Sequence, residues 1–210
     1  MKIGLSVIMP SFLGEYDGCA TDREKKFVRA VQSFLDNTLI EKELIIIGDN
    51  CILTKKILYD IYEKEINFGN IKFYQFNKKQ KVFSGSLRSK GIDLASYDYI
   101  SYLDTDDMIG NNHLSSILNQ IKTQNLDWAY FNDFINTEEG LLTKKVELAK
   151  DSIGTSSIIH KKDKKINWDK CDGYGHDFKF IEKLIKWSEK KDKIYGGTYI
   201  ICHIPNQIDK

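Results

Sequence analysis

The feature that most constrains the fold of this 210-residue chain is a regular alternation of short apolar runs with longer amphipathic stretches. The apolar runs are Leu5–Met9, Glu43–Ile47, Ile71–Phe76 and Tyr99–Leu103. Between them, apolar residues recur every three or four positions, which is the period of a helix that buries one face. Strands and helices in this order favour right-handed crossovers between parallel strands. The sequence therefore predicts an α/β fold, a mostly parallel Rossmann-like sheet flanked by helices.

The expected helices are recognised by their apolar stripes. The first follows Thr21-Asp-Arg-Glu24, a capping-box pattern in which Thr21 and Glu24 would satisfy early helix amides. Three stripes are Phe27, Val28, Val31, Phe34 and Leu35; Leu53, Ile57, Leu58, Ile61 and Tyr62; and Leu114, Ile117, Leu118 and Ile121. A further helix is expected over Ser86–Ala95.

The second half of the chain is less regular. Strands are expected at Trp128–Ile135, Gly154–His160 and Tyr195–Ile204, and a helix at Asp177–Ser188. The stretch Asn136–Asp151 reads as a loop. There is no internal repeat, low-complexity tract or linker, so one domain over residues 1–210 is expected.

Composition excludes several classes of function. The 31 basic and 30 acidic residues give a formal charge of +1, which argues against a nucleic-acid partner. No segment is apolar for long enough to span a membrane, and the four cysteines form no C-x-x-C pair. A cytoplasmic location is the expectation. The basic runs Lys161–Lys165 and Lys190–Lys193 favour solvated loops, with peripheral contact to a membrane surface as the alternative.

Acidic residues follow the fourth apolar run without a spacer, as Asp104-Thr-Asp-Asp107. In parallel sheets, ligands bind beyond the carboxyl ends of the strands, which would make Pro10–Ser11, Asp49 and this acidic run neighbours. Three adjacent carboxylates repel one another unless a cation or solvent screens them, and oxygen ligands suit Mg²⁺ and Mn²⁺. A D-x-D pattern alone is uninformative, and the alternative is a solvated turn.

A longer stretch supplies the context. Residues Gly85–Asp107 read GSLRSKGIDLASYDYISYLDTDD. This segment resembles the central signature of family 2 glycosyltransferases of the GT-A fold, in which a helix leads through a strand into a metal-binding D-x-D. The runs LSVIMPSF from Leu5 and ELIIIGDN from Glu43 are similar to the first two strands of that family. The resemblance covers residues 3–110 well. It implies a nucleotide-sugar-binding half over 1–110 and an acceptor-binding half over 111–210.

The resemblance implies a metal site and a cofactor. Asp106 would be the principal ligand of Mn²⁺ or Mg²⁺, and Asp104 would support it. His203 is similar to a late histidine that ligates the metal in some GT-A enzymes, although a lone histidine is more often structural. His113 and His160 read as surface or capping residues.

The resemblance also implies a site for the donor, a UDP-sugar. Asp49 matches an acid that accepts from the uracil ring, Pro10 and Ser11 match the loop along the nucleoside, and Arg88 matches an arginine facing the diphosphate. The alternatives are a turn residue for Asp49 and a surface arginine for Arg88. The chain departs from the family pattern at Gly48, Ser89 and Leu13, which weakens the assignment of the base.

The base that deprotonates the acceptor hydroxyl would be Asp177, in a GYGHD segment that resembles the family's late Glu-Asp motif with His176 in place of Glu. The alternative is that Asp177 caps the next helix. Trp168 and Tyr174 could stack on a sugar, or pack in the core. The resemblance as a whole implies a metal-dependent, inverting transferase acting on a saccharide, lipid-linked or protein acceptor. The alternatives are an inactive nucleotide-sugar-binding module and a sugar nucleotidyltransferase.

Overall fold

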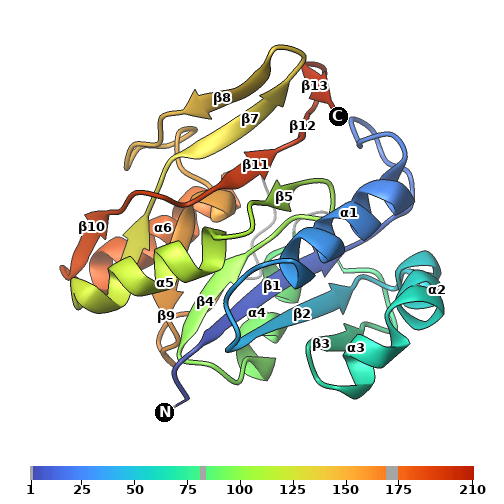
Figure 1. Cartoon of the computed structure of the whole chain (residues 1–210), viewed down its shortest axis with the longest axis horizontal. Helices are drawn as coiled ribbons and strands as arrows, with labels where there is room; N and C mark the ends of the chain where they lie inside the picture. Colours follow the sequence, from blue (N-terminus) through green and yellow to red (C-terminus); the bar gives the residue numbers. More distant parts are fainter. Residues whose placement is uncertain (1, 81–83, 169–174) are drawn as a thin grey trace.

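A central sheet of seven strands runs in the order β10-β6-β9-β4-β1-β2-β3 (Figure 1). The computed structural model describes residues 2–80, 84–168 and 175–210. Strand β9 is antiparallel to both β4 and β6, and the other neighbouring pairs are parallel. This confirms the prediction of a mostly parallel α/β sheet. The strands are β1 (Leu5–Ser11), β2 (Lys42–Gly48), β3 (Ile71–Gln75), β4 (Tyr99–Tyr102), β6 (Trp128–Tyr130), β9 (Ile158–Lys161) and β10 (Lys191–Lys193).

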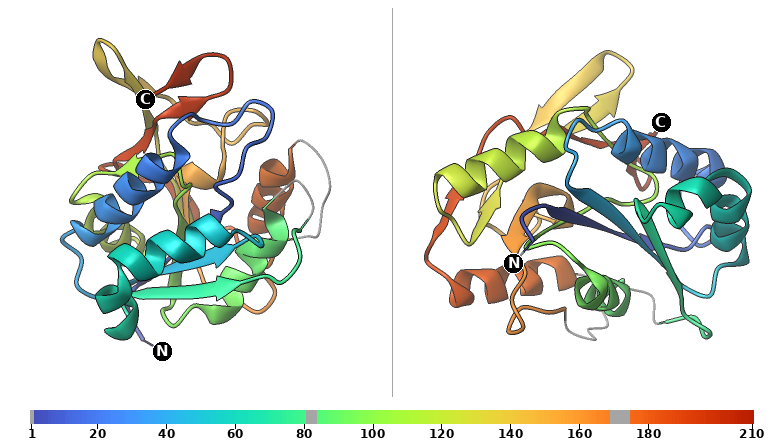
Figure 2. Two further views of the ribbon diagram at one scale, coloured as in Figure 1. Left: turned by 90° about the vertical axis from the view of Figure 1, so that its right-hand side faces the viewer. Right: turned by 60° about the horizontal axis from the view of Figure 1, so that its bottom comes forward.

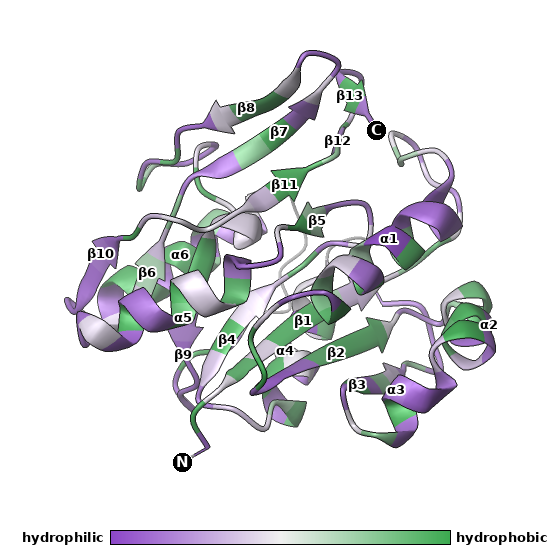
Figure 3. Ribbon diagram, in the orientation of Figure 1, coloured by the Kyte–Doolittle hydropathy of each residue, from purple (hydrophilic) through white to green (hydrophobic). Residues whose placement is uncertain are grey.

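Helices cover both faces of this sheet (Figure 2). One face packs against apolar residues of α1, α2 and α5, and the other against those of α4 and α6. Figure 3 shows the hydrophobic residues along β1 and β2, between these two layers. No helix in the described part of the chain is long and apolar enough to cross a membrane. The helices are α1 (Arg23–Leu35), α2 (Ile52–Ile61), α3 (Glu63–Asn67), α4 (Gly85–Leu94), α5 (His113–Thr123), α6 (His176–Trp187) and the 3₁₀ turn η1 (Thr155–Ser157).

A second sheet, in the order β5-β11-β7-β8, lies beyond the end of the first, and β12 pairs with β13. The expected strand Trp128–Ile135 is therefore divided between two strands in two sheets, and the expected loop Asn136–Asp151 contains the end of β7 and all of β8. The chain leaves the main sheet where the amide of Phe131 bonds the carbonyl of Ser157. The strands are β5 (Met108–Ile109), β7 (Asp133–Thr137), β8 (Gly140–Lys144), β11 (Tyr199–Ile201), β12 (His203–Ile204) and β13 (Ile208–Asp209).

The predicted capping box before α1 is wrong. The helix is preceded by Asp22, which has a left-handed φ of 48°, and no side chain caps it. The amide and hydroxyl of Thr21 instead donate to Asp209 Oδ2 in β13, over 2.9 and 2.5 Å. A contact between residues far apart in the chain has replaced the local cap. Lys191–Lys193 was likewise expected in a loop, yet it forms the edge strand β10.

Candidate active site

The first group of predicted residues meets where β1 and β2 end. The amide of Asp49 donates to the carbonyl of Ser11 over 2.9 Å, which ties the two strand ends together. The Ser11 hydroxyl lies 2.7 Å from that of Thr54 at the start of α2. Asp49 Oδ1 accepts from the amide of Gln80 over 2.5 Å. Burial raises the pKa of Asp49, and that hydrogen bond and the charge of Lys79 partly offset the rise.

The acidic loop after β4 contains carboxylates with two different roles. Asp107 is buried and accepts from the Tyr199 hydroxyl and from the Cys202 amide, both over 2.8 Å. Each of its oxygens thus holds the loop against β11. Burial and the charges of Asp106 and Asp104 nevertheless raise the pKa of Asp107 well above its usual range. Asp107 is a structural residue, which leaves Asp104 and Asp106 as the candidate metal ligands.

These two carboxylates fit a divalent cation. Burial raises the pKa of Asp106, and the nearby charge of Asp104 raises it further, so a cation between them would stabilise both ionised forms. Within residues 2–80, 84–168 and 175–210, no group of three or more His, Cys, Asp or Glu side chains is placed to hold a metal. Mg²⁺ is commonly held by one or two carboxylates together with substrate phosphates, and this pair matches that donor set.

His203 is engaged elsewhere in this structure. Its Nδ1 lies 3.1 Å from Asp209 Oδ1, and its Nε2 lies 3.0 Å from the carbonyl oxygen of Gly18. Because a carbonyl oxygen only accepts, the Nε2 atom carries the proton in that contact. Both ring nitrogens thus anchor the C-terminal hairpin to the loop after β1. The role of His203 as a metal ligand stays a prediction that requires one of these contacts to open.

Arg88 connects the acidic loop to the proposed base. It is buried on α4, which excludes the surface-arginine alternative. Its Nη2 donates to Asp104 Oδ1 over 3.1 Å, and its Nη1 lies 3.7 Å from Asp177 Oδ1 on α6. Two polar residues that the sequence analysis missed, Ser84 and Thr155, also accept from this guanidinium. Neither position carries a sequence signal beyond a polar residue beside a predicted element.

Asp177 lies in the first turn of α6, after Gly175 with its left-handed φ of 89°. Burial raises the pKa of Asp177, but the close approach of the His176 ring, whose Nε2 lies 2.9 Å from Asp177 Oδ1, and the charge of Arg88 outweigh that effect, so the pKa is lowered overall. The ring of Trp168 lies 5.9 Å from that of His176 and stacks on Phe180 at 4.2 Å between ring centroids. Trp168 is therefore a packing residue rather than an exposed sugar platform. Gly173 and Tyr174 lie outside the described residues.

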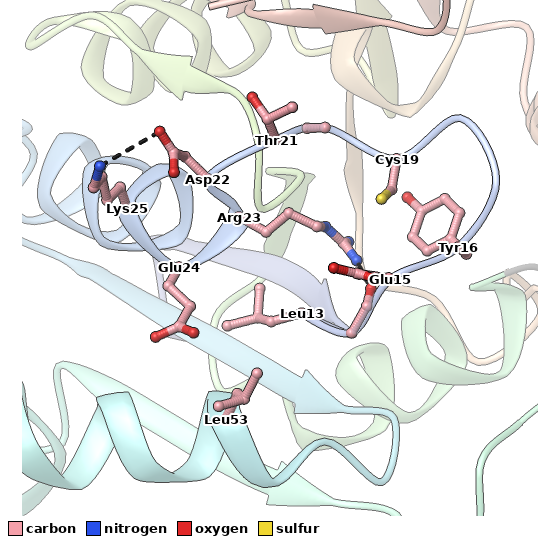
Figure 4. A pocket seen from close by; sticks show the side chains of 12 residues that line it. Leu13, Glu15, Tyr16, Cys19, Thr21, Asp22, Arg23, Glu24, Lys25 and Leu53 are labelled. Atoms are coloured by element: carbon pink, nitrogen blue, oxygen red, sulfur yellow. Dashed lines mark hydrogen bonds and ion pairs between the residues drawn. The ribbon is translucent and has the colours of Figure 1, made fainter.

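A cavity of about 780 Å³ lies at the segment that joins β1 to α1 (Figure 4). It is lined mainly by the segment between β1 and α1, with Leu53 of α2 on the far side. The ring of Tyr16 lies 4.6 Å from the Arg23 guanidinium carbon. Burial raises the pKa of Tyr16, the charge of Arg23 opposes this, and the charges of Asp106 and Asp104 add to it. The cavity thus lies within the electrostatic field of the acidic loop.

The fold and the site together define a class: an α/β domain with an acidic loop at the carboxyl end of its central strands and a buried arginine that joins it to a second carboxylate. The family model of glycosyl transferase family 2 matches residues 6–185. The chain belongs to glycosyl transferase family 2, as the sequence resemblance predicted.

Individual proteins that resemble this chain share only a modest fraction of its residues. The chain is 26% identical over 160 residues to the GalNAc(5)-diNAcBac-PP-undecaprenol beta-1,3-glucosyltransferase of Campylobacter jejuni, matching 76% of this chain and 46% of the relative. It thus spans about half the length of that relative. S. aureus TarS 1–349 superposes with a TM-score of 0.74 at 17% identity, covering 94% of this chain and 60% of that one. The structure of TarS 1–349 in complex with UDP-GlcNAc superposes with a TM-score of 0.74 at 18% identity, covering 95% and 58%. These superpositions confirm the GT-A fold.

Proposed function

We propose that this chain transfers a sugar from a UDP-sugar to an acceptor hydroxyl, with inversion at the sugar carbon and with a divalent metal. Membership of glycosyl transferase family 2 supports the reaction class. Structural relatives described in complex with UDP and with UDP-GlcNAc support a uridine donor. The division into a donor half over 1–110 and an acceptor half over 111–210 belongs to the same proposal.

The observation that carries the proposal is the position of Arg88 between two carboxylates. One of them, Asp104, belongs to the loop that would face the donor, and the other, Asp177, lies in the first turn of a helix in the second half of the chain. A transferase needs these two places close together, because the acceptor oxygen must approach the sugar carbon that the diphosphate leaves. A buried, permanently charged guanidinium at their junction suits the charge of a departing diphosphate.

The donor would bind at the carboxyl ends of β1, β2 and β4. Pro10, Ser11 and Asp49 would line the nucleoside, and Asp104 and Asp106 would hold Mn²⁺ or Mg²⁺. When bound, the metal would supply Lewis-acid stabilisation of the diphosphate. Hydrogen bonds to Asp104 and Thr155 fix the Arg88 guanidinium, so little reorganisation of its side chain would be needed to stabilise the departing diphosphate.

Asp177 would act on the acceptor. Its carboxylate removes the proton of the acceptor hydroxyl while the acceptor oxygen bonds to the sugar carbon. The bond from that carbon to the diphosphate oxygen breaks at the same time, and its electron pair leaves with the nucleoside diphosphate. Because the acceptor enters on the face opposite the leaving group, the configuration at the sugar carbon inverts.

The acceptor is proposed by chemical class only. The C. jejuni relative is named for a polyprenyl-diphosphate-linked saccharide, which supports a lipid-linked saccharide here. Free saccharides and glycosylated proteins are the alternatives that an acceptor screen would separate. A cytoplasmic location and peripheral membrane contact remain predictions.

The first experiment is a thermal-shift titration with UDP, GDP, CDP and TDP, each with and without Mn²⁺. A ligand at a hundred times its dissociation constant adds about 2.7 kcal/mol to the free energy of unfolding. We expect UDP to stabilise the protein in the presence of metal. The Asp106→Ala variant should lose this effect, whereas Asp93→Ala, an exposed residue on α4, should keep it. If no nucleotide shifts the melting temperature under any condition, the proposal is wrong.

Turnover separates an enzyme from a binding module. Release of UDP from UDP-GlcNAc or UDP-glucose should be measurable with the wild type and strongly reduced in Asp177→Asn. Binding of UDP without release from any donor sugar would instead favour an inactive nucleotide-sugar-binding module.

A further inference from the structure

The buried indole of Trp168 lies where elements that carry the candidate site meet. Its Nε1–H donates to the hydroxyl of Tyr102 over 3.1 Å, and Tyr102 ends β4, two positions before Asp104. Its ring also stacks on Phe180 of α6, with the ring planes 8° apart, and Phe180 lies three residues after Asp177. One side chain thus contacts both the strand that leads to the acidic loop and the helix that bears the proposed base.

The same indole also contacts α4. The guanidinium carbon of Arg88 lies over the Trp168 ring, 5.0 Å from its centroid. From the next position of the helix, the Ser89 hydroxyl donates to the carbonyl of Trp168 over 2.9 Å. Ser89 is one of the positions at which the chain departs from the family pattern, and here it fixes the backbone of Trp168. Both the ring and the main chain of Trp168 are therefore tied to the helix that carries Arg88.

A chain of hydrogen bonds fixes the orientation of the indole. An indole nitrogen only donates, so the Tyr102 hydroxyl accepts from Trp168 and has its own proton left for His160 Nε2, which lies 2.8 Å away. That contact requires the His160 proton on Nδ1, which lies 2.8 Å from the carbonyl oxygen of Lys161. Burial lowers the pKa of His160 to about 4, so the ring is neutral and this chain is intact near pH 7. Each group in the chain has a partner of the right kind.

The contact with the ring differs from the other contacts of Arg88. Its terminal nitrogens donate to polar side chains that include Asp104. Asp104 is also a candidate metal ligand, so its attraction for Arg88 would weaken when a cation shares its charge. The aromatic face of Trp168 is not a metal ligand and would keep its contact. A cation and an aromatic ring attract each other most strongly where both are shielded from water, and both Arg88 and Trp168 are buried.

We propose that Trp168 is a positioning residue for Arg88: its fixed ring holds the guanidinium at the junction of the acidic loop and α6, where the donor diphosphate would bind. This inference rests on the proposed function, because its effect is exerted on the donor. Loss of the ring would leave space into which the guanidinium can move. A displacement of about 1 Å of a charged group is costly in such a site.

The test is the affinity for UDP in the presence of Mn²⁺, measured by isothermal titration calorimetry. In Trp168→Leu, which lacks an aromatic face, we expect the Kd for UDP to rise about tenfold or more. In Trp168→Phe, which keeps a smaller ring but lacks the indole N–H, we expect a rise of about fivefold. The matched control is Trp187→Phe, at the far end of α6 and packed against the same core, which should stay within about 1.5-fold of wild type. Urea unfolding verifies that each variant is folded, because a loss of stability alone does not change the affinity of the folded protein.

A double-mutant cycle separates positioning from packing. Arg88→Met removes the charge but keeps an unbranched side chain, and it should weaken UDP binding. Adding Trp168→Phe to Arg88→Met should weaken binding no further, because the group that the ring positions is already gone. If the two substitutions instead weaken binding multiplicatively, Trp168 acts without Arg88 and the inference is overturned. It is also overturned if Trp168→Phe binds UDP as tightly as the wild type. This comparison stays decisive even where Trp168→Leu fails to fold.

Release of UDP from UDP-GlcNAc and UDP-glucose, measured on the same proteins, tests the proposed function separately. Turnover by the wild type, with unchanged UDP affinity in the Trp168 variants, overturns this inference alone. UDP binding without release from either donor overturns the proposed transfer, while the affinities still decide whether Trp168 positions Arg88. If the wild type binds no UDP, the proposed function fails and the inference falls with it.

Discussion

The Tyr199 hydroxyl donates to Asp107 Oδ2 over 2.8 Å and accepts from the backbone amide of Asp104 over 3.1 Å. One buried tyrosine on β11 thus holds both ends of the acidic loop. Because β11 belongs to the second half of the chain, the residues that would bind the donor are positioned by an element almost a hundred residues later in the sequence. The acidic loop of the first half therefore depends on the second half of the chain for its position.

Tyr199→Phe should accordingly loosen the acidic loop. The substitution removes one donor from the buried carboxylate of Asp107 and one acceptor from the Asp104 amide. Hydrogen bonds to charged groups contribute about 1.5–3 kcal/mol, so we expect a loss of that size in the free energy of unfolding. Urea unfolding measures it, with Tyr59→Phe on the exposed face of α2 as the matched control. Equal stability of the two variants would contradict this role.

Arg88→Lys should cost both stability and donor affinity. Lysine keeps the positive charge, but it lacks the planar guanidinium whose two terminal nitrogens approach Asp104 and Asp177 at the same time. We expect a loss of about 1.5–3 kcal/mol in the free energy of unfolding and a much smaller UDP-induced thermal shift. Lys90→Arg, on the same helix, is the control for exchanging one cation for the other. A variant with wild-type stability would mean that the Arg88 contacts contribute nothing to the fold.

Much of the first half could be predicted from sequence, for a physical reason. Parallel strands covered on both faces are almost wholly apolar, so Leu5–Met9 and Glu43–Ile47 stand out as β1 and β2. The residues after such strands fall at one edge of the sheet whatever the loops do. That rule predicts that Pro10–Ser11, Asp49 and the acidic run Asp104–Asp107 are neighbours, whereas the role of Arg88, which lies on a helix, was predicted only from the family resemblance.

The rest depended on contacts between distant parts of the chain. Asp106 and Asp107 are adjacent and chemically identical, and only Tyr199 and Cys202 make the second one structural. Similarly, His113 and His160 were expected as surface or capping residues, but both are buried. The residues next to a histidine in the sequence do not show whether a distant side chain will form a hydrogen bond with its ring. For His160 that side chain is Tyr102, whose hydroxyl lies 2.8 Å from Nε2.

These buried histidines predict how stability varies with pH. Burial lowers the pKa of His160 to about 4 and that of His113 to about 3. An unfolded histidine titrates near pH 6.5, so below about that pH the unfolded chain binds protons that the folded chain refuses. Stability from these residues is fully present above about pH 6.5 and is lost as the pH falls toward 4.

His160→Gln should remove one of these two contributions. Between about pH 6 and pH 4.5, the free energy of unfolding of the variant should fall less steeply than that of wild type, by about 1.4 kcal/mol per pH unit. The raised pKa of Asp107 acts in the opposite direction, but it is common to both proteins and cancels in the difference. Urea unfolding at several pH values provides the slopes. His113→Gln should give the same change, and parallel curves for all three proteins would contradict the assignment.

Asp209 joins the β12–β13 hairpin to the segment before α1, so its contacts indicate which residues would lose protection if the hairpin detached. Its carboxylate accepts from Thr21 and Lys26 and lies 3.1 Å from His203 Nδ1. Burial raises the pKa of Asp209, but the hydrogen bonds from Lys26 and Thr21 outweigh this effect and hold that pKa well below its usual range. Asp209→Asn should therefore speed amide hydrogen exchange about tenfold or more in β12, β13 and residues 17–22, with β1 unchanged. Asp192→Asn, exposed on β10, is the control, and unchanged exchange in the first variant would show that Asp209 does not hold this segment.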